Sequence, residues 1–164
     1  MPGSTPERLA YWYLRLNGFV TLENFIIHPD AGRDQRTEAD LIGVRFASRA
    51  ENYTRPMRDD PQVAKCSTFC NIVIVEVKAS LCDINKTWWN PREENIQRVL
   101  NAIGFLEQPE VQPAAQALYD RGCYSNKYVT CRMMAFGDQR NDVLPIKEAP
   151  QVLFNDMIPF IYQR

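Results

Sequence analysis

The stretch NIVIVEVK, residues 71–78, decides the fold of this chain and locates its chemistry. Residues 72–75 (IVIV) are all β-branched, which is typical of a strand buried on both faces of a sheet. Glu76 and Lys78 lie two positions apart, so in a strand their side chains project from the same face. A carboxylate and an ammonium at the end of a buried strand are costly unless they pair or hold an ion. The pair therefore predicts either a structural salt bridge or a metal site.

The length and composition indicate one globular domain over residues 1–164. Of the 164 residues, 45% are hydrophobic and 24% charged, which is ordinary for such a domain. No apolar run approaches the ~20 residues of a membrane span, and MPGSTPERLA lacks the apolar core of a secretory signal. Five cysteines, an odd number at irregular spacings, argue against a disulfide framework and predict a reducing, cytoplasmic environment. A net charge of −1 excludes a protein that coats nucleic acid by charge alone, so any contact with nucleic acid must use local basic patches.

Periodicity and turn residues predict an alternation of helices and strands. A helix capped by Thr5 should run to about Asn17 and stop at Gly18, and Asn90-Pro91 should open a second helix. Residues 47–69 carry many charges and no periodicity, which predicts a long insertion loop. The remaining predicted elements are strands at 19–27, 41–46, 127–136 and 143–146, a helix over 111–121 ended by Gly122, and a last helix capped by Asn155.

Four charged residues mark a candidate site. Asp40 precedes a predicted strand, Glu76 and Lys78 end the next one, and Glu7 lies in the first turn of the N-terminal helix. Gln97 follows on the helix after the Glu-x-Lys pair. The tripeptide alone is common, but an apolar strand before it and an acidic residue upstream make the pattern more specific.

This order resembles the PD-(D/E)xK nuclease superfamily, and it is similar to the archaeal Holliday-junction resolvases within it. The resemblance covers roughly residues 5–136 and implies an α/β restriction-endonuclease-like core, with a mixed sheet of about four to five strands flanked by helices. Ala39 stands where the family name has proline. A literal Pro-Asp occurs at Pro29-Asp30, but it falls in an expected loop, so Asp40 is the preferred match.

The resemblance implies a metal-dependent endonuclease that cleaves DNA. Asp40, Glu76 and the backbone carbonyl of Val77 would hold Mg²⁺, for which Mn²⁺ should substitute. Lys78 would act on the attacking water or on the charge that develops on the phosphate, with Glu7 and Gln97 in supporting roles. Related nucleases often pair to cut two strands, so a homodimer or another protein partner stays open.

Other candidates carry weaker predictions. His28 is the only histidine, which excludes a multi-histidine zinc site, and the C-x₃-C spacing of Cys66 and Cys70 lacks a second pair. Trp88 and Trp89 could stack on unpaired bases, but packing under the next helix is the preferred interpretation. A set of basic residues surrounds the proposed site and could together grip a phosphate backbone: Arg33, Arg36, Arg45, Arg49, Arg55, Arg58, Lys86, Arg92 and Arg98.

A second hypothesis uses the same fold without catalysis. The slightly acidic balance and the lack of a recognisable sequence-reading domain favour a nuclease-like module that binds nucleic acid or protein within a defence or repair assembly. Small hydrolases of other types are disfavoured, because the chain has no G-x-S-x-G elbow, Walker loop or H-E-x-x-H motif.

Overall fold

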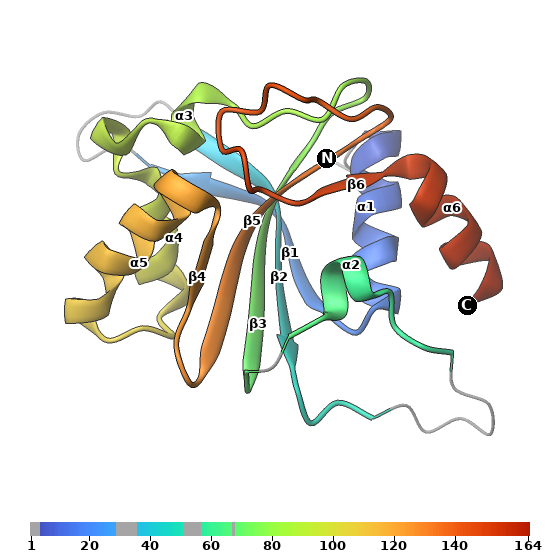
Figure 1. Cartoon of the computed structure of the whole chain (residues 1–164), viewed down its shortest axis with the longest axis horizontal. Coiled ribbons are helices and arrows are strands. Elements are labelled where there is room, and N and C mark those ends of the chain that lie inside the picture. Colours follow the sequence, from blue (N-terminus) through green and yellow to red (C-terminus); the bar gives the residue numbers. More distant parts are fainter. Residues whose placement is uncertain (1–3, 29–35, 51–56, 67) are drawn as a thin grey trace.

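The computed structural model describes residues 4–28, 36–50, 57–66 and 68–164 (Figure 1). Its helices are α1 (Thr5–Leu16), α2 (Pro61–Ala64), α3 (Lys86–Trp89), a 3-10 turn η1 (Pro91–Glu93), α4 (Asn95–Ile103), α5 (Gln108–Arg121) and α6 (Phe154–Gln163). Its strands are β1 (Val20–Ile27), β2 (Thr37–Phe46), β3 (Cys70–Val77), β4 (Cys123–Ser125), β5 (Val129–Gly137) and β6 (Gln151–Leu153). No helix of the described residues is long and apolar enough to cross a membrane.

The strands form one mixed sheet in the order β1-β2-β3-β5-β4, and β6 adds to β5. β1, β2 and β3 pair antiparallel as successive neighbours, whereas β3 and β5 run parallel. The parallel pair requires a crossover, and α3, α4 and α5 supply it. The prediction of an α/β protein with a mixed sheet is confirmed, and six strands replace the four to five expected.

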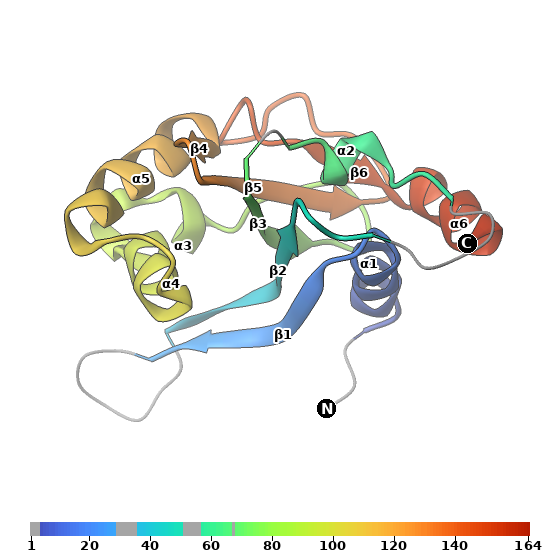
Figure 2. The same cartoon turned by 90° about the horizontal axis from the view of Figure 1, so that it is seen from below.

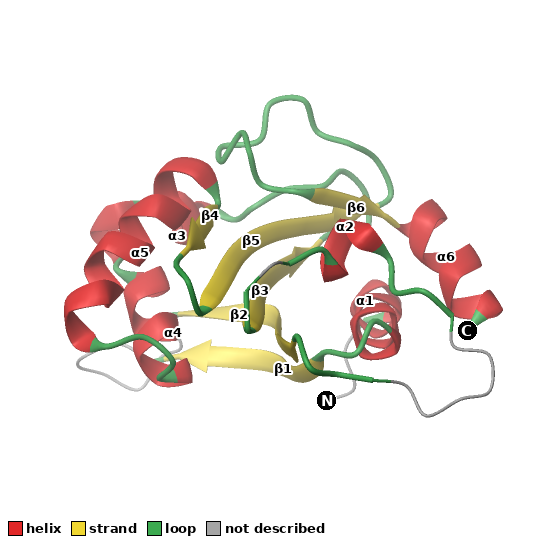
Figure 3. Cartoon of the chain, turned by 60° about the horizontal axis from the view of Figure 1, so that its bottom comes forward, coloured by secondary structure: helices red, strands yellow, loops and turns green. Residues whose placement is uncertain are grey.

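Each face of the sheet is covered by its own group of helices. Ile72 and Ile74 of β3 face the core under α4 and α5, and Val73 and Val75 face the core under α1 and α6. Residues 72–75 of this central strand are completely buried, as the β-branched run predicted. α3, α4 and α5 gather on one side and α1, α2 and α6 on the other (Figure 3). Glu76 shares the parity of Ile74, so the end of β3 presents it to the side of α3.

Several predicted boundaries were wrong. Residues 143–146 form a turn rather than a strand, although Leu144 and Ile146 are buried there. The last helix begins at Phe154 after Leu153, without the expected cap at Asn155, and the expected loop 47–69 contains α2. Gly18 and Gly122 do follow their helices with left-handed φ angles of 81° and 72°, as helix stops require.

The N-terminus of α1 is held by a capping box that starts one residue earlier than predicted. The Ser4 side chain accepts a hydrogen bond from the backbone N–H of Glu7, and the Glu7 carboxylate accepts one from the backbone N–H of Ser4 at 2.9 Å. Ser4, not Thr5, is therefore the N-cap.

Replacing Ser4 with alanine should lower the free energy of unfolding by about 1 kcal/mol, the usual cost of losing an N-cap oxygen. Urea denaturation followed by circular dichroism measures this change. Ser48→Ala is the matched control, because Ser48 is exposed and lies outside any helix. Equal losses in the two variants would contradict a role for the capping box.

Candidate metal centre at the end of β3

Glu76 and Lys78 form an ion pair at the end of the central strand. Lys78 Nζ lies 2.9 Å from Glu76 Oε2. The Glu76 side chain is only 1% exposed, whereas that of Lys78 is 28% exposed. The two side chains thus share a face, as their spacing predicted, and the amine connects a buried carboxylate to solvent.

Asp40 reaches the same end of β3 from the neighbouring strand. The β2–β3 ladder runs up to the pair Leu41–Val75, and continuing its register places Asp40 opposite Glu76. There the Asp40 carboxylate takes the place of a β2 backbone carbonyl as hydrogen-bond acceptor, because its Oδ2 accepts the Val77 N–H at 2.7 Å. Beyond this point β1 and β2 continue towards α4 and leave the end of β3 (Figure 2).

Burial and nearby negative charge raise the pKa values of both carboxylates. Burial, and next the charge of Asp40, raise the pKa of Glu76 to about 7, although the charge and hydrogen bond of Lys78 oppose them. The pKa of Asp40 is also raised, mainly by burial, against the opposing effects of the Val77 N–H and Lys78. Two carboxylates with raised pKa values at one place form the type of site that a cation would stabilise.

One oxygen of Glu76 is left without a partner. Glu76 Oε1 and the indole Nε1 of Trp88 are both buried and lack a hydrogen bond. The indole N–H of Trp88 lies close enough to lower the pKa of Glu76, but the two groups do not form a full hydrogen bond. The raised pKa of Glu76 follows from its burial and from the charge of Asp40, with no full hydrogen bond on Oε1 to offset them. Trp88 is fully buried, as predicted, and it closes this side of the site.

Glu7 is related to the site through Asp40. Its charge is one of the causes that raise the pKa of Asp40, but it does not appear among the groups acting on Glu76. Glu7 belongs to α1, which packs on the opposite face of the sheet from Ile74 and Glu76, and its carboxylate is engaged with Ser4. The structure therefore places Glu7 near one acid and not at the centre of the group.

Gln97 and Val77 stay predictions as site residues. Gln97 Oε1 accepts a hydrogen bond of 2.8 Å from the hydroxyl of Tyr119, which fixes the amide between α4 and α5. The N–H of Val77 points to Asp40, and the carbonyl of a strand residue points to the same side as its N–H. The Val77 carbonyl is thus directed towards the Asp40 side of β3.

The fit to a divalent cation is partial. Within the described part of the chain, no three His, Cys, Asp or Glu side chains converge in a geometry that would hold a metal ion. The donors near the end of β3 are two carboxylates and a backbone carbonyl. This oxygen-only set suits Mg²⁺, which commonly uses one or two carboxylates and keeps several waters.

Many of the basic residues predicted to grip phosphate are instead used inside the protein. Asp59 accepts Arg45 at 2.6 Å, Arg49 at 3.0 Å and Arg164 at 3.3 Å, which fastens the 57–66 segment to α6 and β2. Arg36 pairs with Glu93 at 3.0 Å. Lys86 and Arg92 are exposed, whereas Arg33 and Arg55 lie outside the described residues. Arg58, before α2, is exposed as well, and Arg98 lies 3.9 Å from Glu94, so the exposed basic residues of the predicted set are split between α3 and the segment before α2.

The weaker candidates lie away from Glu76 or outside the described chain. His28 is exposed at the end of β1, and Pro29 and Asp30 fall outside the described residues. All five cysteines are free thiols. Trp89 is partly exposed, unlike its buried neighbour.

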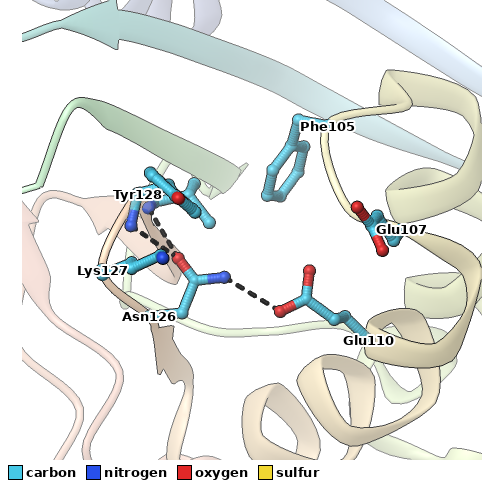
Figure 4. Close-up of a pocket in the computed structure, with 7 residues that line it drawn as sticks. Phe105, Glu107, Glu110, Asn126, Lys127 and Tyr128 are labelled. Atoms are coloured by element: carbon cyan, nitrogen blue, oxygen red, sulfur yellow. Dashed lines mark hydrogen bonds between the residues drawn. The ribbon is translucent and has the colours of Figure 1, made fainter.

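A separate pocket of about 560 Å³ lies between the α4–α5 connection and the β4–β5 hairpin. Figure 4 shows Glu110 pointing towards Asn126, whose side-chain amide donates to it at 3.2 Å. Phe105 and Tyr128 give the pocket two aromatic walls. The acids of this pocket are hydrogen-bonded within it or exposed, whereas Glu76 is buried with one oxygen unpartnered.

The sequence does not predict that Trp88 closes one side of the site. The sequence predicts packing for Trp88, but its position beside Glu76 follows only from the path of residues 78–88. That path is fixed by backbone hydrogen bonds from Asp138 to Ser80 at 2.6 Å and from Cys82 to Gln139 at 2.8 Å.

A comparison with known protein families, curated proteins and solved structures finds no match to this chain.

Proposed function

We propose that this protein is a Mg²⁺-dependent endonuclease of the PD-(D/E)xK type that cleaves DNA phosphodiesters. The observation that carries the proposal is the buried, unpartnered Oε1 of Glu76, held beside Asp40 and Lys78. A buried carboxylate oxygen without a hydrogen bond costs stability, and such groups concentrate at functional sites. The order of α1, β1, β2, β3, the crossover helices and β5 agrees with the restriction-endonuclease-like core that the sequence resemblance implies.

Asp40, Glu76 and the Val77 carbonyl are the groups that would hold the ion. When bound, Mg²⁺ would supply Lewis-acid polarisation of the phosphate and a water of lowered pKa. Lys78 would orient that water or stabilise charge developing on the phosphate, and its partial exposure lets it reach a substrate. Exposed Lys86 and Arg92 would contact the backbone of the nucleic acid. The charge of Glu7 would raise the pKa of Asp40, and Gln97 of α4 would orient a phosphate or Lys78.

Replacing Asp40 with asparagine tests the metal site directly. Asparagine keeps an oxygen that can accept the Val77 N–H, so the fold should survive. Titration calorimetry with Mn²⁺ at pH 8 should give binding to the natural protein and at least about tenfold weaker binding to Asp40→Asn, the range seen when a metal-site partner is lost. Asp120→Asn, at an exposed position on α5, is the control and should bind like the natural protein. An absence of Mn²⁺ binding in the natural protein would refute the proposal.

The alternative is a nuclease-like module that binds nucleic acid or protein without cleaving it. The internal ion pairs of Arg36, Arg45 and Arg49 favour this reading, because they remove charge from the surface that a substrate would meet. In that case the Lys78–Glu76 pair would be structural. DNA retention in a gel-shift assay without cleavage in Mg²⁺ or Mn²⁺ would support the module over the enzyme.

A further inference from the structure

A second pocket brings two cysteines together at the other end of the sheet from Glu76. The pocket has a volume of about 470 Å³, and Cys66, Cys123, Lys65, Ser125 and Thr130 line it. Cys66 precedes β3 and Cys123 begins β4, the strand that borders β5. The two cysteines come from segments far apart in the chain and line one cavity, and they are close enough for the charge of Cys66 to raise the pKa of Cys123.

A row of hydroxyl groups fixes the position of Cys66. Its Sγ lies 2.9 Å from the hydroxyl of Thr68, which lies 3.1 Å from that of Thr130. The Thr130 hydroxyl in turn lies 2.9 Å from that of Ser125 on β4. The Thr68 hydroxyl donates to the carbonyl of Cys70 at 2.9 Å, and it can turn this one proton to Cys66 when the thiol loses its own.

A buried arginine supplies positive charge to the same place. Cys123 pairs across the β4–β5 ladder with Arg132, so the two side chains share a face of the sheet. The Arg132 guanidinium donates to the carbonyls of Val63 and Gln62 and to the side chain of Asn71, and its Nε has no partner. No carboxylate of the described residues forms an ion pair with it, and the ionisable groups that act on its charge are all thiols: Cys123, Cys66 and Cys131.

These surroundings separate Cys66 from the other cysteines. Burial tends to raise the pKa of Cys66, but hydrogen bonds from Thr68 and Thr130 and the charge of Arg132 outweigh it and lower the pKa. Burial raises the pKa of Cys70, of Cys123 and, to about 11, of Cys82. A thiolate is the reactive form of cysteine, so Cys66 is the thiol best prepared to react.

We propose that Cys66 and Cys123 form a peroxide-sensitive dithiol site, in which Cys66 is oxidised first and Cys123 then closes a disulfide onto it. Cys70 is less suited as the partner, because its side chain packs against the core under α4 and α5, whereas Cys123 shares the face of Arg132. The disulfide would tie the segment after α2 to the edge strand β4.

The chemistry balances with hydrogen peroxide as the oxidant. The Cys66 thiolate attacks one peroxide oxygen, so an S–O bond forms, the O–O bond breaks, and hydroxide leaves and takes a proton to become water. The Cys123 thiolate then attacks the Cys66 sulfur, so the S–S bond forms, the S–O bond breaks, and a second water leaves. Two thiols and one peroxide thus give one disulfide and two waters.

Peptide mapping by mass spectrometry tests the proposal on the full chain treated with one equivalent of hydrogen peroxide. The natural protein should give a Cys66–Cys123 disulfide. Cys66→Ser should leave Cys123 reduced, and Cys123→Ser should leave a sulfenic acid at Cys66 that dimedone traps. Cys70→Ser is the matched control and should form the same disulfide as the natural protein.

A rate measurement tests the surroundings of Cys66 independently of disulfide formation. Iodoacetamide should label Cys66 faster in the folded protein at pH 7 than in protein unfolded by urea, and Arg132→Gln should slow the labelling by roughly tenfold, the effect of about one pKa unit on the thiolate population. Slower labelling in the folded protein, a Cys66–Cys70 bond, or a bond between two chains would overturn the proposal. Neither readout involves DNA or metal, so they are independent of the proposed nuclease activity.

Discussion

Replacing Glu76 with glutamine should stabilise the metal-free protein above pH 7 by up to about 3 kcal/mol. The carboxyl has a pKa of about 7 in the folded protein against a reference of 4.5. Between these values the folded state binds a proton that the unfolded state has released, so stability falls as the pH rises from about 4.5 to about 7. Glutamine has the same shape and no charge, so this loss should disappear in the variant.

Urea denaturation between pH 5 and pH 9 in the presence of a chelator measures the effect. The natural protein should lose stability between pH 5 and about pH 7 and then level off, and Glu76→Gln should show a flatter profile with a residual slope from Asp40, whose pKa is raised too. Glu107→Gln, at an exposed position, is the control and should follow the natural protein. If Glu76→Gln did so as well, the carboxylate would be ionised in an ordinary environment, and the central feature of the site would be lost.

The same pair of proteins separates an ion site from a plain salt bridge. At pH 8, Mn²⁺ should raise the melting temperature of the natural protein, because a ligand that binds only the folded state stabilises it. It should leave Glu76→Gln unchanged. A purely structural pair with Lys78 predicts no response to Mn²⁺ in either protein.

Replacing Lys78 with methionine should reduce DNA cleavage by about 10²- to 10⁴-fold, the usual contribution of a group that moves a proton or stabilises developing charge. Methionine keeps an unbranched side chain at a partly exposed position, so folding should be preserved. Metal binding should also be preserved, since the predicted ligands are Asp40, Glu76 and Val77. Single-turnover cleavage of a DNA fragment in Mg²⁺ gives the rate.

The control for this change is Lys147→Met, at an exposed lysine in the turn before β6. It has the same change in charge, so it corrects for weaker general attraction to DNA. Full cleavage by Lys78→Met would remove the amine from the mechanism. A loss of equal size in both variants would assign the effect to binding and not to chemistry.

The sequence predicted the central strand and the shared face of Glu76 and Lys78, because both depend on short-range rules. A β-branched run forms a strand in almost any sheet, and two residues two positions apart share its face. The hydrogen bond from the Val77 N–H to Asp40 could not be predicted. This hydrogen bond forms where the β2–β3 ladder ends, and the sequence does not show at which residues the two strands separate.

The predictions of a strand at 143–146 and of a basic surface were wrong for related reasons. Leu144 and Ile146 carry the alternation of a strand, but Pro145 lies between them and their burial comes from packing of a turn. Asp59, which lies in a segment without periodicity, pairs with two of the predicted arginines, Arg45 and Arg49, and also with Arg164. Sequence patterns indicate which residues are charged, but whether a charge meets solvent or an internal partner is decided by tertiary contacts.

The parallel pairing of β3 with β5 has a consequence for the burial of the site. β2 and β3 are antiparallel neighbours, but the 47–69 excursion separates them, so Asp40 and Glu76 meet through a non-local contact, and β5 joins β3 only across the still longer α3–α5 crossover. Burial of the two acids therefore requires both long connections to close. The raised pKa that burial gives Glu76 is a property of the complete sheet and of the crossover that carries Trp88, and not of the β2–β3 pair alone.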